Sequence, residues 1–175
     1  MLKNISVRFD PVEDRMVIRL AIQGTGQTEQ HCALHVTRRV FAVWRQDLQT
    51  MLDLSAEVPQ RLDAIARASV SRAHHDAMAD QATTRTESAT SLAETSPTPT
   101  LVTRIVCARR REDGRWLMRF ERRGEAALGL VLSGRTMHAL VDAVFRRLQV
   151  AQWGLASLPV EAKLPNQAKS GSPLH

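Results

Sequence analysis

Apolar and polar residues alternate in three short stretches at the beginning of the chain. The stretches are residues 5–9, 16–22 and 29–36. A period of two puts every second side chain on the same face, so each stretch is predicted to be a strand with one buried face. Asp10-Pro11 and Gly24 to Gly26 stand between them, and these residue types favour tight turns.

A helix is predicted to follow the third strand. Thr37 stands directly before it, and its hydroxyl is typical of an N-cap. Pro59 comes a few residues after the last apolar position, so the helix is expected to end before it. The apolar residues recur at spacings of three and four and form one stripe: Val40, Phe41, Trp44, Leu48, Met51 and Leu52.

The second half of the chain follows the same plan. Strands are predicted over residues 103–109, 116–120 and 128–132, and Glu112-Asp113-Gly114 predicts a hairpin turn between the first two. Ser133 is expected to cap a second helix, which Trp153-Gly154 is expected to end. The stripe of this helix consists of Met137, Leu140, Val141, Val144, Phe145 and Leu148.

Several residues recur in register between the two halves. Arg15 matches Arg115 and Arg19 matches Arg119 at a shift of 100 positions, and the two capping residues match at a shift of 96. We interpret this as an internal duplication of a β-β-β-α unit. One unit of roughly 50 residues buries too little surface alone, so the halves are expected to share a core. The prediction is an α+β fold: an antiparallel sheet, or pair of sheets, with both helices packed on one side.

The stretch between the halves differs in composition. Residues 60–82 are rich in alanine and predict a third helix, but its apolar stripe is thin, so loose docking is expected. That stripe consists of Leu62, Ile65, Ala66, Val70 and Ala73. Residues 83–100 are expected to be a flexible linker and 155–175 a disordered tail. The predicted division is 1–58 (first repeat), 59–100 (helix and linker), 101–154 (second, basic repeat) and 155–175 (tail).

Positive charge is concentrated in the second half. The net charge of the chain is +6, and residues 101–153 carry it, with eleven arginines against five acidic residues. The planar fork of arginine suits anionic groups, so an anionic partner is predicted for this half. The alternative is an ordinary solvated face. The candidate residues are Arg104, Arg109, Arg110, Arg111, Arg115, Arg119, Arg122 and Arg123; Arg115, Arg119 and Arg104 are expected on or near the sheet face away from the helices.

No metal site, cofactor or catalytic group is predicted from the motifs. His31 and His35 share one side of a strand while Cys32 points to the other, so they do not converge on a metal ion. The two cysteines, Cys32 and Cys107, are expected to be free thiols in a reducing compartment. The glycines lack the spacing of a nucleotide-binding loop.

The helical histidines offer no catalytic pair either. Neighbours in His74-His75-Asp76 point in different directions on a helix, and His138 with Asp142 is expected to be an ordinary surface pair. The protein is therefore predicted not to be an enzyme.

Two functions remain open. The first is a binding or assembly protein, an adaptor whose basic second repeat docks an acidic partner. The second is a single-stranded nucleic-acid-binding protein of pseudo-dimeric β-sheet type. In architecture alone, the repeated strands-then-helix plan resembles the PUR and Whirly single-strand-binding families, but no motif of either is matched, and the aromatic content of 4% is low for base stacking. A cytoplasmic protein without a membrane segment is expected, with a monomer favoured over a homodimer.

Overall fold

The structure is a computed structural model that describes residues 2–24, 29–59, 61–83 and 97–155. Most of the predicted linker and nearly all of the predicted tail lie outside the described residues, as does part of the turn at Gly24 to Gly26. The elements are β1 (Leu2–Asp10), β2 (Arg15–Gln23), β3 (Glu29–Thr37), α1 (Arg38–Ser55), α2 (Ala64–Thr83), β4 (Thr100–Arg109), β5 (Trp116–Arg122), β6 (Glu125–Leu132) and α4 (Gly134–Ala151).

The described residues form an α+β fold, as predicted, with six strands and three helices. The order of strands and capped helix occurs twice along the chain. The common origin of the two halves stays a prediction. Helices α1 and α4 begin where the sequence predicts. Their N-caps form the expected hydrogen bonds: Thr37 Oγ1 accepts one from Val40 N (3.3 Å), and Ser133 Oγ accepts one from Thr136 N (3.2 Å).

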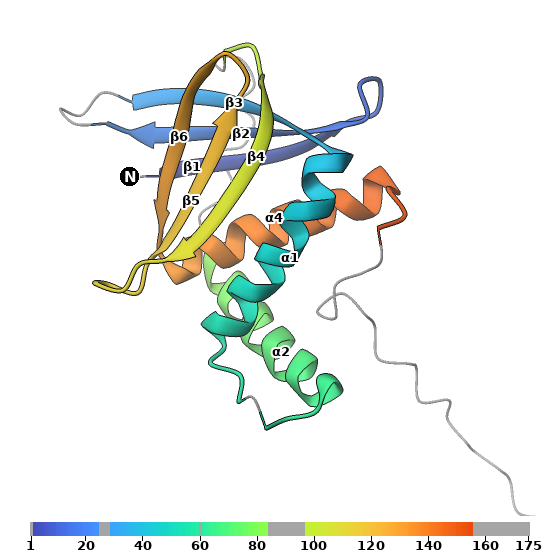
Figure 1. Cartoon of the computed structure of the whole chain (residues 1–175), viewed down its shortest axis with the longest axis vertical. Helices are drawn as coiled ribbons and strands as arrows, with labels where there is room; N and C mark the ends of the chain where they lie inside the picture. Colours follow the sequence, from blue (N-terminus) through green and yellow to red (C-terminus); the bar gives the residue numbers. More distant parts are fainter. Residues whose placement is uncertain (1, 25–28, 60, 84–96, 156–175) are drawn as a thin grey trace, which may run out of the picture.

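The sheet is mixed, and the prediction of an antiparallel sheet is wrong at one junction. Its order is β1-β2-β3-β4-β5-β6, and β3 runs parallel to β4. The reason is the connection: the chain leaves β3 through α1 and α2 before it returns to the sheet, and a long crossover allows a parallel neighbour where a hairpin does not. Figure 1 shows the strands β1–β3 lying across the strands β4–β6, so the sheet is strongly twisted. The edge strands β1 and β6 come into contact.

Both α1 and α4 pack on one face of the sheet, but each lies against the other half. Among the strands, α1 contacts mainly β4 and α4 contacts mainly β1 (Figure 1), while the other side of α4 packs against α2. A single hydrophobic core therefore contains residues of both halves. Its largest fully buried side chains are Trp44, Phe41, Phe120, Met16, Ile18, Leu20, Leu34, Leu48, Met51, Leu52, Met118 and Leu132.

Helix α2 docks by a face that the sequence did not indicate. The stripe expected to pack is outside, with Ile65 74% exposed and Val70 40% exposed. Instead Ser71, His75 and Ala79, spaced by four residues, are buried. Tertiary contact with α4 and α1 decides the orientation here, because the helix has almost no amphipathic pattern of its own.

One hydrogen bond joins the C-terminal end of α4 to the turn between β1 and β2. Trp153 Nε1 donates to Asp14 Oδ1 at 2.6 Å, and the Trp153 ring, which is 3% exposed, stands edge-on to Phe9. The helix itself ends at Ala151, two residues before the predicted stop, with Gln152 in the left-handed conformation.

Replacing Asp14 by glycine should lower the free energy of unfolding by about 1–2 kcal/mol, because it leaves the indole N–H without an acceptor. Glycine is suited to the positive φ of 49° at this position, so backbone strain does not add to the loss. Urea unfolding measures the change. Asp14→Asn keeps a side-chain oxygen and should unfold close to the wild type; equal loss in both variants would contradict the role of the hydrogen bond.

Across the part of the chain that the structure describes, none of the helices has the length and apolar character needed to cross a membrane.

Candidate binding groove

Strands β3 and β4 lie side by side over only two residue pairs. Leu34 is opposite Thr100 and His35 is opposite Leu101. Beyond this point β3 ends and the chain turns into α1, whereas β4 continues to Arg109 with β5 on its other side. From Val102 onward, one edge of β4 therefore has no strand beside it among the described residues. Such an edge leaves backbone N–H and C=O groups without ladder partners.

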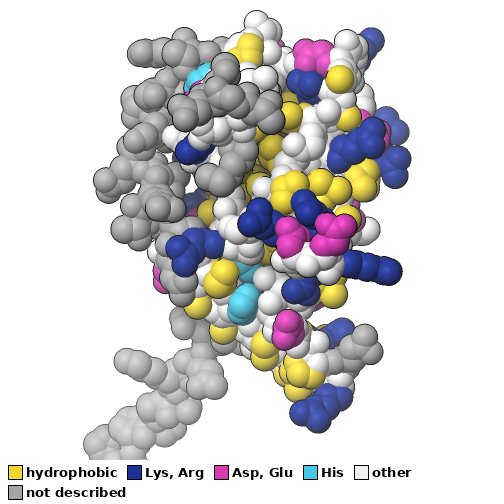
Figure 2. All heavy atoms as spheres, turned by 90° about the vertical axis from the view of Figure 1, so that its left-hand side faces the viewer, with side chains coloured by type: hydrophobic (Ala, Val, Ile, Leu, Met, Phe, Trp, Pro, Cys, Tyr) yellow, Lys and Arg dark blue, Asp and Glu magenta, His cyan; other side chains and the backbone are white. Residues whose placement is uncertain are grey.

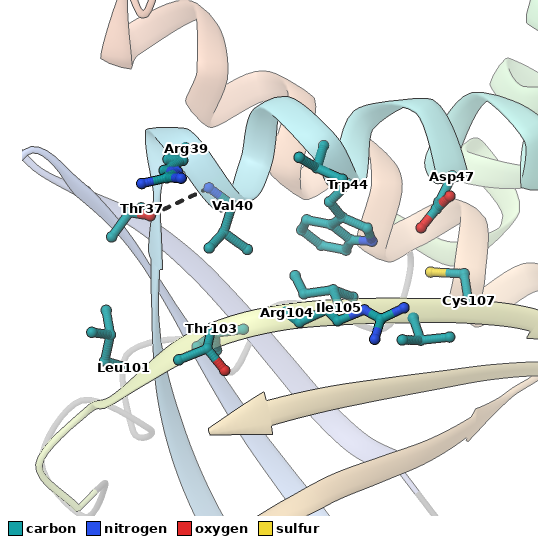
Figure 3. Close-up of a pocket in the computed structure, with 13 residues that line it drawn as sticks. Thr37, Arg39, Val40, Trp44, Asp47, Leu101, Thr103, Arg104, Ile105 and Cys107 are labelled. Atoms are coloured by element: carbon teal, nitrogen blue, oxygen red, sulfur yellow. Dashed lines mark hydrogen bonds between the residues drawn. The ribbon is translucent and has the colours of Figure 1, made fainter. Parts of the chain in front are cut away.

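A groove of about 870 Å³ runs between this edge and helix α1. The strand side consists of the seven consecutive residues from Leu101 to Cys107 (Figure 3). Successive side chains of a strand point to opposite faces, so a wall made of consecutive residues is the edge of the strand and not one of its faces. The groove is thus positioned by the separation of β3 from β4.

The helix side of the groove is largely apolar. Val40, Val43, Trp44 and Asp47 line it at spacings of three and four, after Thr37 and Arg39 at the beginning of the helix. Val43 is 68% exposed, whereas Val40 is half-buried and packs partly against the core. Trp44 is 1% exposed and joins the groove to the core.

Charge is distributed unevenly along the groove. Arg39 and Arg104 are exposed, and neither makes an ion pair with an acidic residue in the described ranges. The first turn of α1 contains no acidic residue, so the partial positive charge of the helix N-terminus adds to that of Arg39. Figure 3 shows Arg39 at the end formed by Thr37 and Leu101, and Asp47 at the end formed by Cys107. An acidic group is therefore attracted to the Arg39 end and repelled from the Asp47 end.

The polar groups at the bottom of the groove are not poised for nucleophilic chemistry. Burial raises the pKa of the Cys107 thiol to about 11, so it stays protonated at neutral pH. The nearby Trp44 indole counteracts this rise only in part, and its Nε1 atom is buried without a hydrogen-bond partner among the described residues. Cys107 and Cys32 are both free, as predicted.

The arginines predicted to bind an anion do not form one patch. Three of them pair with neighbouring acids: Arg110 with Glu112 and Asp113, Arg115 with Asp113, and Arg122 with Glu125. Arg109 lies over the Trp116 ring at 5.7 Å and donates to Leu54 O and Gly114 O. Figure 2 shows basic side chains at several separate places on one side of the molecule, with acidic ones between some of them.

Four of the predicted arginines are exposed and make no ion pair in the described part of the chain: Arg104, Arg111, Arg119 and Arg123. Arg104 and Arg119 lie on the sheet face away from the helices, as expected, opposite Glu121 and Val106 respectively. Arg115 is exposed and lies directly before β5, where it pairs with Asp113. The exposed large hydrophobic side chains of the described residues are all Val, Leu or Ile, so this face offers no aromatic ring for base stacking.

A second polar cluster, missed in the sequence, lies where α1, α2 and α4 meet. His138 is completely buried and His75 is 4% exposed, and their Nδ1 atoms are 2.9 Å apart. Ser55 Oγ is 3.0 Å from His138 Nε2 and 3.4 Å from His74 Nε2.

The expected surface pair of His138 with Asp142 is wrong, because His138 is buried and Asp142 pairs with Arg146 at 2.9 Å. The available signal was position: His138 precedes Val141 and Phe145 by three and seven residues, on the apolar stripe of its helix. Burial first, and then the neighbouring histidines, lower the pKa of His138 to about 3. A base this weak is poorly matched to general-base catalysis near neutral pH, whereas a neutral imidazole is well suited to join three helices.

In the described ranges, no group of three or more His, Cys, Asp or Glu side chains is placed to hold a metal ion.

Comparisons with known proteins found no match: no protein-family model matches the chain, and no curated protein or solved structure is significantly similar to it.

Proposed function

We propose that the protein is a non-enzymatic binding or assembly protein, an adaptor whose basic second half docks an acidic protein partner in the groove between α1 and β4. One observation carries the proposal. The groove combines an open strand edge, the apolar side chains of Val40 and Val43, and two exposed arginines that make no ion pair in the described residues, Arg39 and Arg104. Apolar contact with flanking charge is the usual composition of a specific protein interface.

Single-stranded nucleic acid is the second candidate, because Arg104 shares the outer sheet face with Arg119. Two features favour a protein instead. The exposed hydrophobic side chains of the described residues include no aromatic ring on which a base would stack. The carboxylate of Asp47 lines the groove and would repel a continuous phosphate backbone, whereas a protein segment can be acidic at one end only.

Charge reversal of the groove arginines should remove the binding of an acidic polypeptide. With fluorescent poly-L-glutamate as the probe, Arg39→Glu with Arg104→Glu should weaken binding by more than about tenfold in low salt, because two attractive contacts become repulsive. Fluorescence anisotropy measures the affinity. Both side chains are exposed, so the variant should keep the wild-type unfolding midpoint.

The matched control is Arg61→Glu with Arg67→Glu, which changes the net charge equally at exposed arginines outside the groove and outside the basic second half. This control should bind poly-L-glutamate no more than about threefold more weakly than the wild type, because it changes only the long-range electrostatic potential of the protein. Equal loss in both double variants would contradict the groove as the site. A thymidine homopolymer that binds more tightly than poly-L-glutamate at the same salt concentration would favour nucleic acid.

A further inference from the structure

We propose that the partner enters the groove as an additional β-strand, which pairs with the free edge of β4 between Val102 and Cys107. This inference rests on the proposed function and adds the form that the bound segment takes. The place beside β4 is the one that β3 occupies at Thr100 and Leu101 and leaves beyond them. An incoming strand would continue the ladder where β3 departs.

The edge of β4 differs from the two outer edges of the sheet. Strands β1 and β6 approach each other, and Arg147 Nε of α4 donates to Val7 O of β1 at 3.0 Å, which occupies part of that edge. By contrast, the stretch of β4 from Val102 onward has β5 on one side and the groove on the other. Main-chain hydrogen bonds to such an edge give affinity without requiring a particular sequence.

The side chains of the groove define the partner's chemistry. A bound strand would present alternate side chains to Val40 and Val43, which favours β-branched apolar residues at those positions. The side chains between them point to the outer sheet face, where acidic residues would meet Arg104. An acidic residue at the end near Thr37 would meet Arg39, whereas the Asp47 end excludes acidic residues. The partner segment is thus extended, alternates acidic and β-branched residues, and is less acidic at the end that lies near Cys107.

A second copy of this chain fits the edge poorly. Strand β4 contains Arg104 and Arg109 and no acidic residue, so two β4 edges side by side would bring like charges together. Like charges across a strand pair destabilise it, whereas an acidic strand gains from the same arginines.

The test compares two synthetic peptides by calorimetry on the whole protein. Both alternate Glu and Val over a length equal to the free edge of β4, and in one of them every backbone nitrogen is methylated. Methylation keeps the charge and the valines but removes the N–H groups that a strand donates. We expect the unmodified peptide to bind and the methylated peptide to bind at least about tenfold more weakly, because several backbone hydrogen bonds are lost.

Each other outcome decides against the inference. If the two peptides bound equally well, and neither bound to the variant Arg39→Glu with Arg104→Glu, strand addition would be contradicted. The proposal of an acidic partner would still hold. If neither peptide bound, strand addition would be contradicted. If poly-L-glutamate also failed to bind, the proposed function would be contradicted as well. Self-association that the unmodified peptide disrupts would identify a second copy as the occupant.

Discussion

Phe41→Ala should lower the free energy of unfolding by about 3–5 kcal/mol, the usual cost of deleting a fully buried aromatic ring. Phe41 has no exposed surface and its ring lies 5.8 Å from both the Trp44 and the Trp153 ring. It therefore joins the helix of the first half to the residues that follow α4. Because each helix packs on the opposite half, a cavity here weakens the whole core and not one lobe. Urea unfolding followed by circular dichroism measures the loss.

The matched control lies two residues away on the same helix. Val43 is 68% exposed, so Val43→Ala should change the free energy of unfolding by less than about 0.5 kcal/mol. If Phe41→Ala unfolded at the wild-type urea concentration, or if it lost only one of two separate transitions, the shared core would be contradicted.

Acid should destabilise the protein before its carboxylates titrate. Burial and the neighbouring histidines lower the pKa of His138 from about 6.5 in the unfolded chain to about 3 in the folded protein. Between these two values the ring is protonated in the unfolded state and neutral in the folded state. The stability that the neutral ring contributes is fully present above pH 6.5 and is lost as pH falls below it. Each pH unit costs up to about 1.4 kcal/mol, which gives about 2–3 kcal/mol between pH 6.5 and 4.5.

The groups around His138 act in both directions. His74 and His75 of α2 oppose its protonation, and the pKa of His75 is also lowered, chiefly by burial. Asp142 and Asp76 attract a proton to His75, but burial outweighs them. Urea midpoints measured between pH 7 and 4.5 check how steeply the stability falls with pH. His138→Gln should be less stable than the wild type at pH 7, but its stability should fall less in acid. If the stability of this variant fell with pH as steeply as that of the wild type, His138 would not be the group responsible.

The strands and capped helices could be predicted because their signals are local. Thr37 and Ser133 were identified as N-caps from residue type and position, and both accept the expected hydrogen bonds. The Asp113-Gly114 turn also forms where predicted, with Gly114 at a φ of 67°. Each of these features depends on a few neighbouring residues, so the sequence alone contains the information.

The relative placement of elements could not be predicted in the same way. The parallel pairing of β3 with β4 and the exchange of helices between halves depend on contacts between residues far apart in the chain. The docking face of α2 illustrates the reason: Ile65 and Val70 look like a buried stripe, yet His75 is the residue that packs against α4. Polar burial of this kind requires a partner, and His138 is 63 positions away.

The candidate site was predicted only in part. A positive second half was expected, and Arg104 does line the groove. Arg39 was not foreseen, because its proximity to β4 arises from the crossing of α1 over the other half. Local acids neutralise Arg110, Arg115 and Arg122, which charge counting along the sequence treats as equivalent to the rest.

Amide hydrogen exchange along the whole chain, with and without the alternating Glu-Val peptide, locates the bound segment on the protein. We predict slowed exchange confined to β4 between Val102 and Cys107 and to the first turns of α1, because these segments form the groove. Slowing in β5, β6 or β1 with β4 unchanged would place the partner on another surface and contradict the groove.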